Sequence, residues 1–406
     1  MPGAARERKR RISIDLYDTS QGLERNAHRS AKRNRLPKIL VLALIPLTAA
    51  DTAIFHSLLS SVMLSGILVI VATTLFCAGR LRFYTPHLWI AVMVVSVFLA
   101  YFIPQVRLES SGLPLQTFTW LLVGLLVLTV TMAAPPNAGV LIKVILLTGT
   151  VTAIVAGVQG SLQSGRLQGI ELNPNYLAVY LVTSIVISIG LAIDRRNPLW
   201  LIPGSICIFP LVSSQSREGF LAAIAGVAFA VIQKISPNQR VLLTIATIAA
   251  VVLFPGDLSS AASVGAGTRS TAELNTDNTV RAQVALFALD VAVEHPIRGI
   301  GLGQFPAYAE ASSSLGVYIT TTNEYLLLAT ETGISSLVAL AALLWIAIRR
   351  RRQGDLAIIR ATVFASIVAM LFIDLFSNPV VSVPFWACLG TLLADNGVEI
   401  GQSARR

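Results

Sequence analysis

The chain has 406 residues, of which 54% are hydrophobic and only 13% charged, and its mean hydropathy is +0.71. This composition is better solvated by lipid than by water, so it excludes a soluble multidomain enzyme. The net charge of +10, from 31 basic and 21 acidic residues, would suggest nucleic-acid binding in a soluble protein, but here the charge is concentrated in one arm and no nucleic-acid partner is expected.

That basic arm is the N-terminal segment. Residues 1–38 hold 11 Lys and Arg against four acidic residues, which supplies +7 of the +10. The apolar stretch after it continues into further apolar stretches without a cleavage site, so residues 1–37 are interpreted as a retained cytoplasmic tail. Anionic membrane lipids attract such a tail by about 1 kcal/mol per basic residue near the surface, which favours a surface-bound arm over a solvated one.

Apolar stretches dominate the rest of the chain, and about twelve of them approach the roughly 20 residues that a membrane-crossing helix needs. The sequence therefore predicts an all-α integral membrane protein, a bundle of about 12 transmembrane helices with one large extracytoplasmic loop between spans 9 and 10. The predicted spans lie near residues 38–55, 58–78, 87–104, 114–133, 138–158, 174–193, 199–214, 219–234, 240–254, 323–348, 360–377 and 379–395.

The distribution of basic residues orients these spans. With the arm in the cytoplasm, alternation puts 25 of the 31 basic residues on the cytoplasmic side, as the positive-inside rule requires. The predicted organisation is then a cytoplasmic tail (1–37), spans 1–9 (38–254), an extracytoplasmic loop (255–322), spans 10–12 (323–395) and a cytoplasmic C-terminal tail (396–406).

The second half of the long loop predicts an amphipathic helix. Between Val280 and Glu294, apolar side chains recur at helical spacing at positions 284, 287, 288 and 291. Arg281 lies one turn before the first of these four. Pro296 and a turn with glycines at 299, 301 and 303 follow. We expect this helix to lie across the mouth of the bundle and to end before Pro296.

Polar residues at the ends of spans are the candidate functional residues, because an ionisable group in lipid is costly. Arg217 follows Ser216 in a polar break between two apolar stretches, and it either pairs with Glu218, reaches out to the interface, or forms an anion site. Asn173 precedes Pro174 and Asn175 and is a candidate helix cap. The free backbone N–H groups in the first turn of that helix would also suit phosphate oxygens.

Four polar stretches follow one another in a fixed order over roughly residues 160–345. They are Asn173-Pro174-Asn175-Tyr176-Leu177, Ser216-Arg217-Glu218-Gly219, Arg281 with His295 to Phe305, and Thr322-Asn323-Glu324-Tyr325-Leu326 leading to Glu331-Thr332-Gly333. In their order and spacing these stretches resemble the O-antigen ligase and polymerase family, membrane enzymes that move glycans from polyprenyl-pyrophosphate carriers at the outer face of the cytoplasmic membrane.

The resemblance implies roles for individual residues. Arg217 and Arg281 match the family's pyrophosphate-holding arginines, and Thr322 and Asn323 would face the acceptor, with Asn323 orienting either an acceptor hydroxyl or a loop carbonyl. Five further residues are candidates for substrate binding: Arg166, Asn173, Asn175, His295 and Glu324. No metal or other cofactor is expected, because paired guanidinium groups can stabilise the leaving pyrophosphate.

Two positions depart from the family's pattern. Thr322 stands where the family's ligases usually have a histidine that activates the acceptor hydroxyl, and Ala285 stands where tryptophan is frequent. A threonine hydroxyl is not basic near neutral pH. Glu324, Glu310 or His295 would have to substitute, unless the acceptor differs or transfer has been lost.

These features favour a metal-independent, inverting glycan ligase or polymerase in the bacterial cytoplasmic membrane, with both termini in the cytoplasm. Its expected partners are a polyprenyl-pyrophosphate-linked glycan as donor, a glycan, lipid or protein as acceptor, and membrane lipids. Two alternatives stay open. One is a non-catalytic relative that binds a lipid-linked glycan, and Thr322 supports it. The other is a polysaccharide flippase or transporter, in which ionisable residues at mid-membrane depth and internal repeats would be expected.

Overall fold

The computed structural model describes residues 35–54, 66–73, 85–108, 112–163, 166–169, 173–234 and 271–403. In chain order its elements are α2 (Arg35–Ile54), a helix at 66–73, α4 (Thr85–Phe102), α5 (Leu113–Ala133), α6 (Ala138–Gln159), β1 (Leu162–Gln163), β2 (Arg166–Leu167), α7 (Pro174–Arg195), η1 (Pro198–Trp200), α8 (Leu201–Ser213), α9 (Arg217–Ile232), α12 (Thr271–Glu294), α13 (Phe305–Ala311), α14 (Glu324–Thr332), α15 (Ile334–Arg349), α16 (Asp355–Ala369), η2 (Leu375–Ser377) and α17 (Pro379–Ser403).

Apolar helices make up the bundle, which confirms the all-α membrane class. Within the described residues, four helices, α4 to α7, are long and apolar enough to cross a membrane, and shorter apolar helices lie at Leu36–Ala49, Pro198–Ser213, Ile334–Arg349 and Pro379–Ala394. The count of about 12 spans stays a prediction. The span at 240–254, most of the span at 58–78, the arm at 1–34 and the loop residues 255–270 lie outside the described residues.

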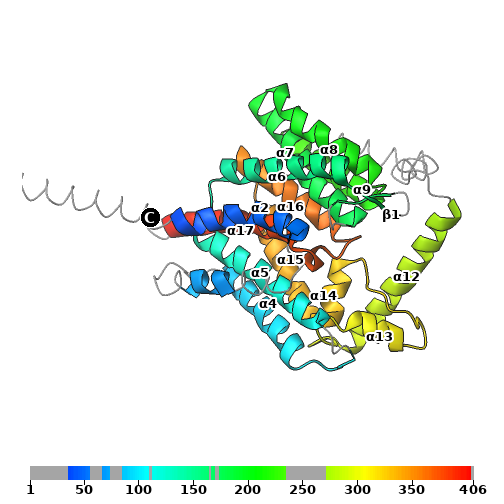
Figure 1. Ribbon diagram of the computed structural model, residues 1–406. Coiled ribbons are helices and arrows are strands. Elements are labelled where there is room, and N and C mark those ends of the chain that lie inside the picture. Colours follow the sequence, from blue (N-terminus) through cyan, green and yellow to red (C-terminus); the bar gives the residue numbers. More distant parts are fainter. Residues whose placement is uncertain are drawn as a thin grey trace, which may run out of the picture.

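Helix α7 lies at the centre of one half of the bundle. In its most apolar 18-residue window 78% of the residues are buried, against 33% in α4, because α7 packs against α6, α8, α9 and α16. In Figure 1, α7, α8 and α9 form one side, α4, α14 and α15 form the other, and α5 and α17 pack together between them. This arrangement buries α7 in protein and leaves most of α4 at the surface of the bundle.

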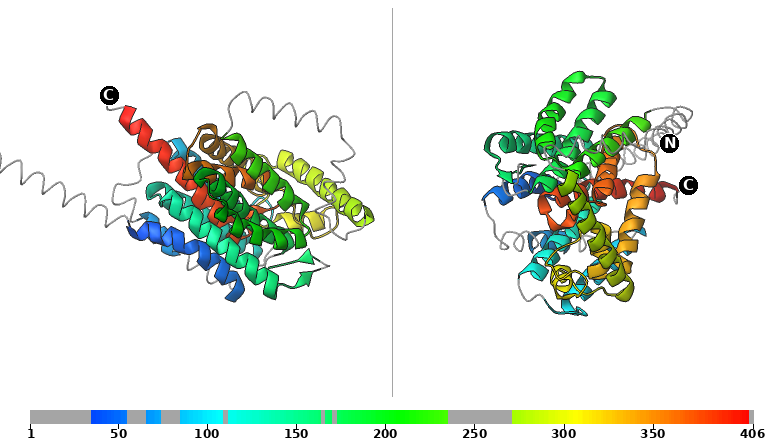
Figure 2. Two further views of the ribbon diagram at one scale, coloured as in Figure 1. Left: turned by 90° about the horizontal axis from the view of Figure 1, so that it is seen from above. Right: turned by 90° about the vertical axis from the view of Figure 1, so that its right-hand side faces the viewer.

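Polar contacts join neighbouring helices at each end of the bundle. At one end Arg195 pairs with Asp355 at 2.7 Å and Lys234 with Asp194 at 2.5 Å. At the other end Tyr176 Oη donates to Asp374 Oδ1 at 2.8 Å. In Figure 2 (left), α12 and the β1–β2 hairpin lie at the end opposite the C-terminus. The helices therefore alternate in direction as the sequence predicts.

The tenth predicted span, 323–348, is wrong as one continuous helix. It is divided into α14 and α15 at Gly333, whose φ is +86°. The turn after α12 packs into this break, where Ile334 N donates to Pro296 O at 2.8 Å and Ile300 N donates to Thr330 O at 2.8 Å. Because buried backbone groups must be paired, the turn stabilises a break that would be costly against lipid.

Other boundaries also differ from the prediction. The eleventh span, predicted over 360–377, is α16, which ends at Ala369 and is followed by a turn and η2. The amphipathic helix predicted from Val280 begins earlier, at Thr271, and ends at Glu294 as expected. Helix α17 continues to Ser403, past the predicted end at 395. Polar residues extend α12 and α17 without an apolar period that would reveal them, whereas α16 ends inside an apolar run, Met370 to Ile373, that gives no sign of a turn.

Candidate functional site

The site is built on the N-terminus of α9. Gln215 adopts a left-handed conformation with φ of +50°, and this sharp turn separates α8 from α9. Ser216 then caps α9, because its Oγ accepts from Gly219 N at 3.3 Å. The polar break of the sequence is therefore a capped helix start, which presents the first backbone N–H groups and the positive end of the helix dipole.

Arg281 reaches this helix start from α12. Its Nη1 donates to Glu218 Oε1 in an ion pair, and Ser216 Oγ donates to the other carboxylate oxygen at 3.1 Å. The Glu218 side chain is 7% exposed and the Arg281 side chain 24%. Burial alone raises the pKa of Glu218, but the Arg281 guanidinium and the hydrogen bonds to the carboxylate outweigh it and hold the pKa below its usual value. Glu218 is therefore ionised near neutral pH.

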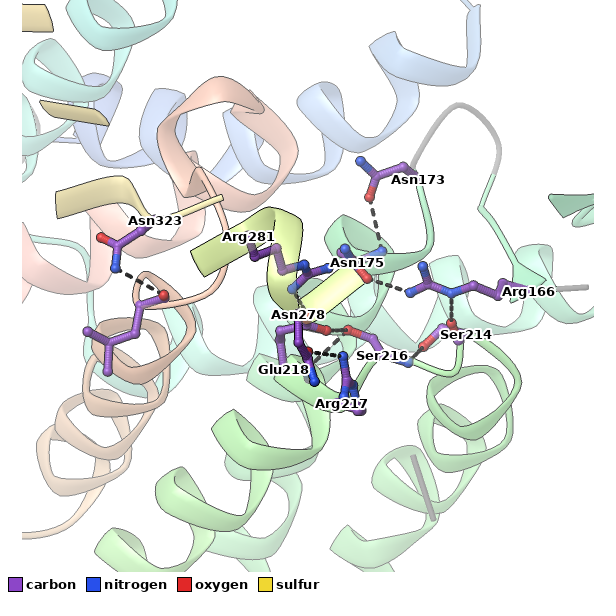
Figure 3. A network of polar contacts seen from close by, with 12 residues as sticks. Arg166, Asn173, Asn175, Ser214, Ser216, Arg217, Glu218, Asn278, Arg281 and Asn323 are labelled. Atoms are coloured by element: carbon purple, nitrogen blue, oxygen red, sulfur yellow. Dashed lines mark hydrogen bonds and ion pairs between the residues drawn. The ribbon is translucent and has the colours of Figure 1, made fainter. Parts of the chain in front are cut away.

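Arg217 makes a second link between the same two helices. Its Nη2 donates to Asn278 Oδ1 at 3.0 Å, and Asn278 lies one turn before Arg281 on α12. Figure 3 shows Arg217, Glu218, Asn278 and Arg281 gathered where the two helices meet. The alternative in which Arg217 pairs with Glu218 is thus wrong, since the carboxylate binds Arg281 instead.

A third arginine lies beside this cluster. Arg166, on β2, donates from Nε to Ser214 O at 2.9 Å and from Nη2 to Asn175 Oδ1 at 2.5 Å. Asn173 caps α7, since its Oδ1 accepts from Asn175 N and from Tyr176 N, each at 3.0 Å. The predicted cap is confirmed, and Arg166 ties the start of α7 to the end of α8 (Figure 3).

The acceptor-side residues occupy a neighbouring helix start. Asn323 caps α14 through its Oδ1, which accepts from Leu326 N at 3.1 Å, and its Nδ2 donates to Leu371 O at 3.1 Å. Of its two predicted roles, the structure shows the one on a loop carbonyl. Glu324 is 2% exposed and accepts from Phe376 N at 2.8 Å, so its carboxylate fixes the turn before α17. Thr322 is half-buried directly before this cap.

His295 is separated from the two arginines. It follows the last residue of α12, 14 positions after Arg281, which at about 1.5 Å per residue puts their backbones about 20 Å apart. Its Nδ1 lies 2.5 Å from Gln105 Oε1, and its ring meets Tyr308 edge-on. The structure brings Arg166, Asn175, Arg217 and Arg281 together but leaves His295 at the opposite end of α12.

Two arginines from different helices, beside a helix N-terminus, suit an anion with several oxygens. Guanidinium groups bind phosphate oxygens in pairs, and free helix N–H groups add to the attraction. Within the described residues, no group of three or more His, Cys, Asp or Glu side chains is arranged to hold a metal ion.

Sequence reasoning missed the link between Glu218 and Arg281 and the role of Asn278. The two partners of the ion pair lie 63 residues apart, with residues 235–270 between them outside the described part of the chain. The available signal was a carboxylate directly after Arg217 at a helix start, and it does not reveal which arginine the carboxylate pairs with.

Comparison with known proteins gives one family. Residues 203–340 match the family model described as O-antigen ligase. The matched region runs from α8 into α15 and therefore includes Arg217, Glu218, Arg281, Thr322 and Asn323, whereas the start of α7 lies outside it. No curated protein matches the chain.

Proposed function

Because residues 203–340 match the O-antigen ligase family model, we propose that the chain transfers a saccharide from a polyprenyl-pyrophosphate carrier to an acceptor hydroxyl. The reaction takes place at the outer face of the bacterial cytoplasmic membrane, and the enzyme is a glycan ligase or polymerase. Its donor is a lipid-linked glycan and its acceptor a glycan, lipid or protein.

The observation that carries this proposal is the meeting of Arg217 and Arg281 at the capped start of α9. The resemblance assigns both residues to the pyrophosphate, and the chain's folding brings them to one place although they lie far apart in sequence. Arg166, on β2, binds Asn175 at the start of α7 and adds a third positive charge beside the same site.

The chemistry follows from this arrangement. The acceptor oxygen bonds to the anomeric carbon while the bond from that carbon to the pyrophosphate oxygen breaks, and the hydroxyl proton leaves to a base. Negative charge grows on the leaving pyrophosphate, where preorganised guanidinium groups stabilise it. A single displacement of this kind inverts the anomeric carbon and requires no metal ion.

The proposal includes the topology predicted from the sequence: about 12 spans, a large outer loop and cytoplasmic termini. In that orientation the starts of α7, α9 and α14 all face outward, together with α12. The basic end with Arg195, Lys234 and the arginines at 349–352 faces the cytoplasm, as the positive-inside rule requires.

Thr322 favours a second candidate, a relative that binds the lipid-linked glycan without transferring it. Its hydroxyl cannot serve as the base, and Glu324 is held by the Phe376 N–H while His295 lies at the far end of α12. In this candidate the arginines still bind the donor, so binding and turnover have to be measured separately.

Glycan transfer by the purified protein tests the proposal. The native chain is compared with Arg217→Ala and Arg281→Ala, each in the presence of a chelator, and with Arg298→Ala as a control that removes an exposed arginine at the same end of the bundle. We expect each site variant to lose about 100-fold or more in kcat/KM, and the control to stay within about twofold. Transfer that survives both site substitutions contradicts the proposal, and donor binding without native turnover supports the second candidate.

A further inference from the structure

We propose that Glu218 is a built-in competitor for the donor: its carboxylate occupies the place on Arg281 that a pyrophosphate oxygen takes, and it reclaims Arg281 when the product leaves. This inference rests on the proposed function and names how the same site releases its ligand. It assigns to Glu218 a role distinct from that of either arginine.

The geometry of the ion pair supports this role. Glu218 is the second residue of α9, so its carboxylate lies at the helix start where an incoming anion would bind. One carboxylate oxygen accepts from Arg281 Nη1 and the other from Ser216 Oγ. The two oxygens thus use the same kinds of donor that a phosphate group would use, a guanidinium and a hydroxyl at a helix cap.

Burial makes the competition strong. The Glu218 side chain is only 7% exposed, so water screens it poorly from a neighbouring anion. A pyrophosphate that binds Arg281 must either displace the carboxylate or approach it closely, and both weaken binding. In the empty site the same carboxylate offsets the charge of two arginines that would otherwise repel each other across α9 and α12.

Release of the product explains why a donor site would contain a carboxylate. Transfer breaks the bond to the sugar, so the polyprenyl pyrophosphate that remains carries one more negative charge than the donor did. Two or three arginines alone would hold this product more tightly than the substrate. A carboxylate that returns to Arg281 speeds release and so favours turnover over tight binding.

Binding of pyrophosphate to the full-length protein in nanodiscs tests the inference, with inorganic pyrophosphate and polyprenyl pyrophosphate as probes. Glu218→Gln keeps the size of the side chain and removes its charge. We expect about tenfold lower Kd and a slower off-rate for both probes, with lower KM and lower kcat in transfer. Glu294→Gln is the matched control, since it removes an exposed carboxylate at the other end of α12 and should leave Kd within about twofold.

The direction in which Kd for pyrophosphate changes in Glu218→Gln decides the outcome. If Glu218 only held α12 in place, its removal would weaken binding and raise KM, and that result, or an unchanged Kd, overturns the inference. Glu218→Asp covers the case in which the glutamine variant fails to fold. The shorter side chain keeps the charge but withdraws the carboxylate from Arg281, so Kd for pyrophosphate should fall. A Kd that does not fall overturns the inference equally. If Arg281→Ala binds pyrophosphate as well as the native chain does, the donor site itself is misassigned and the proposed function fails instead.

Discussion

At the scale of single residues, the site combines opposite charges where α9 begins. Arg217 and Glu218 are consecutive, yet each is bonded to a different residue of α12, Asn278 and Arg281. These two contacts, one turn apart on α12, hold α12 against the start of α9 and fix which face of α12 points toward α9. Asn323 acts similarly at α14, where one amide satisfies both the helix start and the Leu371 carbonyl.

Acid should break the contact between Glu218 and Arg281. Because the folded pKa of Glu218 lies below its ordinary value of 4.5, the ion pair contributes its full stability above pH 4.5 and loses it as pH falls through the folded pKa. The free energy of unfolding of the native protein should therefore exceed that of Glu218→Gln at neutral pH by about 3 kcal/mol, and this difference should vanish only below pH 4.5. A difference that disappears between pH 5 and 7 contradicts the assigned charge state.

Thr322 decides whether acceptor activation limits the rate. Thr322→His introduces a group with a pKa of about 6.5 directly before the Asn323 cap, where the family's ligases carry a histidine. We expect kcat to rise about tenfold or more with the donor KM unchanged, measured by glycan transfer. Thr320→His, two residues away, serves as the control. Equal or lower turnover in Thr322→His would show that another group already accepts the proton.

At the scale of elements, the turn after α12 determines the shape of the predicted tenth span. A Cβ on Gly299 would lie 2.4 Å from the Glu331 carbonyl carbon, and one on Gly333 would lie 2.4 Å from Ile297 O, so the two backbones touch. Glycine at both positions permits this contact and the positive φ angles that accompany it. The break between α14 and α15 exists because residues 296–301 supply its backbone partners.

A pair of glycine substitutions isolates that contact. Gly299 and Gly316 have nearly equal φ, +63° and +62°, but the nearest atom to a Cβ on Gly316 is 3.9 Å away. Gly316→Ala should therefore cost only the left-handed strain, about 1 kcal/mol, whereas Gly299→Ala adds a backbone clash and should cost about 3 kcal/mol or more. Thermal unfolding in detergent measures both. Equal costs would mean that the turn does not pack against α14 as described.

The sequence reveals some of these elements and conceals others, for physical reasons. Apolar period and length predict α4 to α7 within a few residues, and Asn173 with Pro174 predicts the start of α7. The break at Gly333 escapes prediction because it depends on a turn from another part of the chain. The pairing of Glu218 with Arg281 escapes for the same reason, since local charge order suggests Arg217 as the partner.

At the scale of the whole molecule, the bundle separates two chemically different ends. The starts of α7, α9 and α14 gather at one end with α12, and the ion pairs of Arg195 and Lys234 lie at the other. The left view of Figure 2 shows the C-terminal end of α17 and α12 at opposite ends. Alternation of helix direction thus collects the candidate site at one end of the bundle.

Cysteine accessibility in intact cells tests the sidedness. In a variant without its native cysteines, Glu310→Cys on the exposed end of α13 should react with a membrane-impermeant thiol reagent added outside. Gln353→Cys, exposed between α15 and α16, should react only after the membrane is permeabilised. The reverse pattern, or equal labelling of both positions, would refute the proposed orientation.

The most direct test of the donor site is a structure of the protein in nanodiscs with polyprenyl pyrophosphate bound. We predict phosphate density at the start of α9, within hydrogen-bond distance of the Arg217 and Arg281 guanidinium groups, with the Glu218 carboxylate displaced from Arg281. Phosphate density elsewhere, with the ion pair between Glu218 and Arg281 intact, would contradict the assignment of this cluster as the site of glycan transfer.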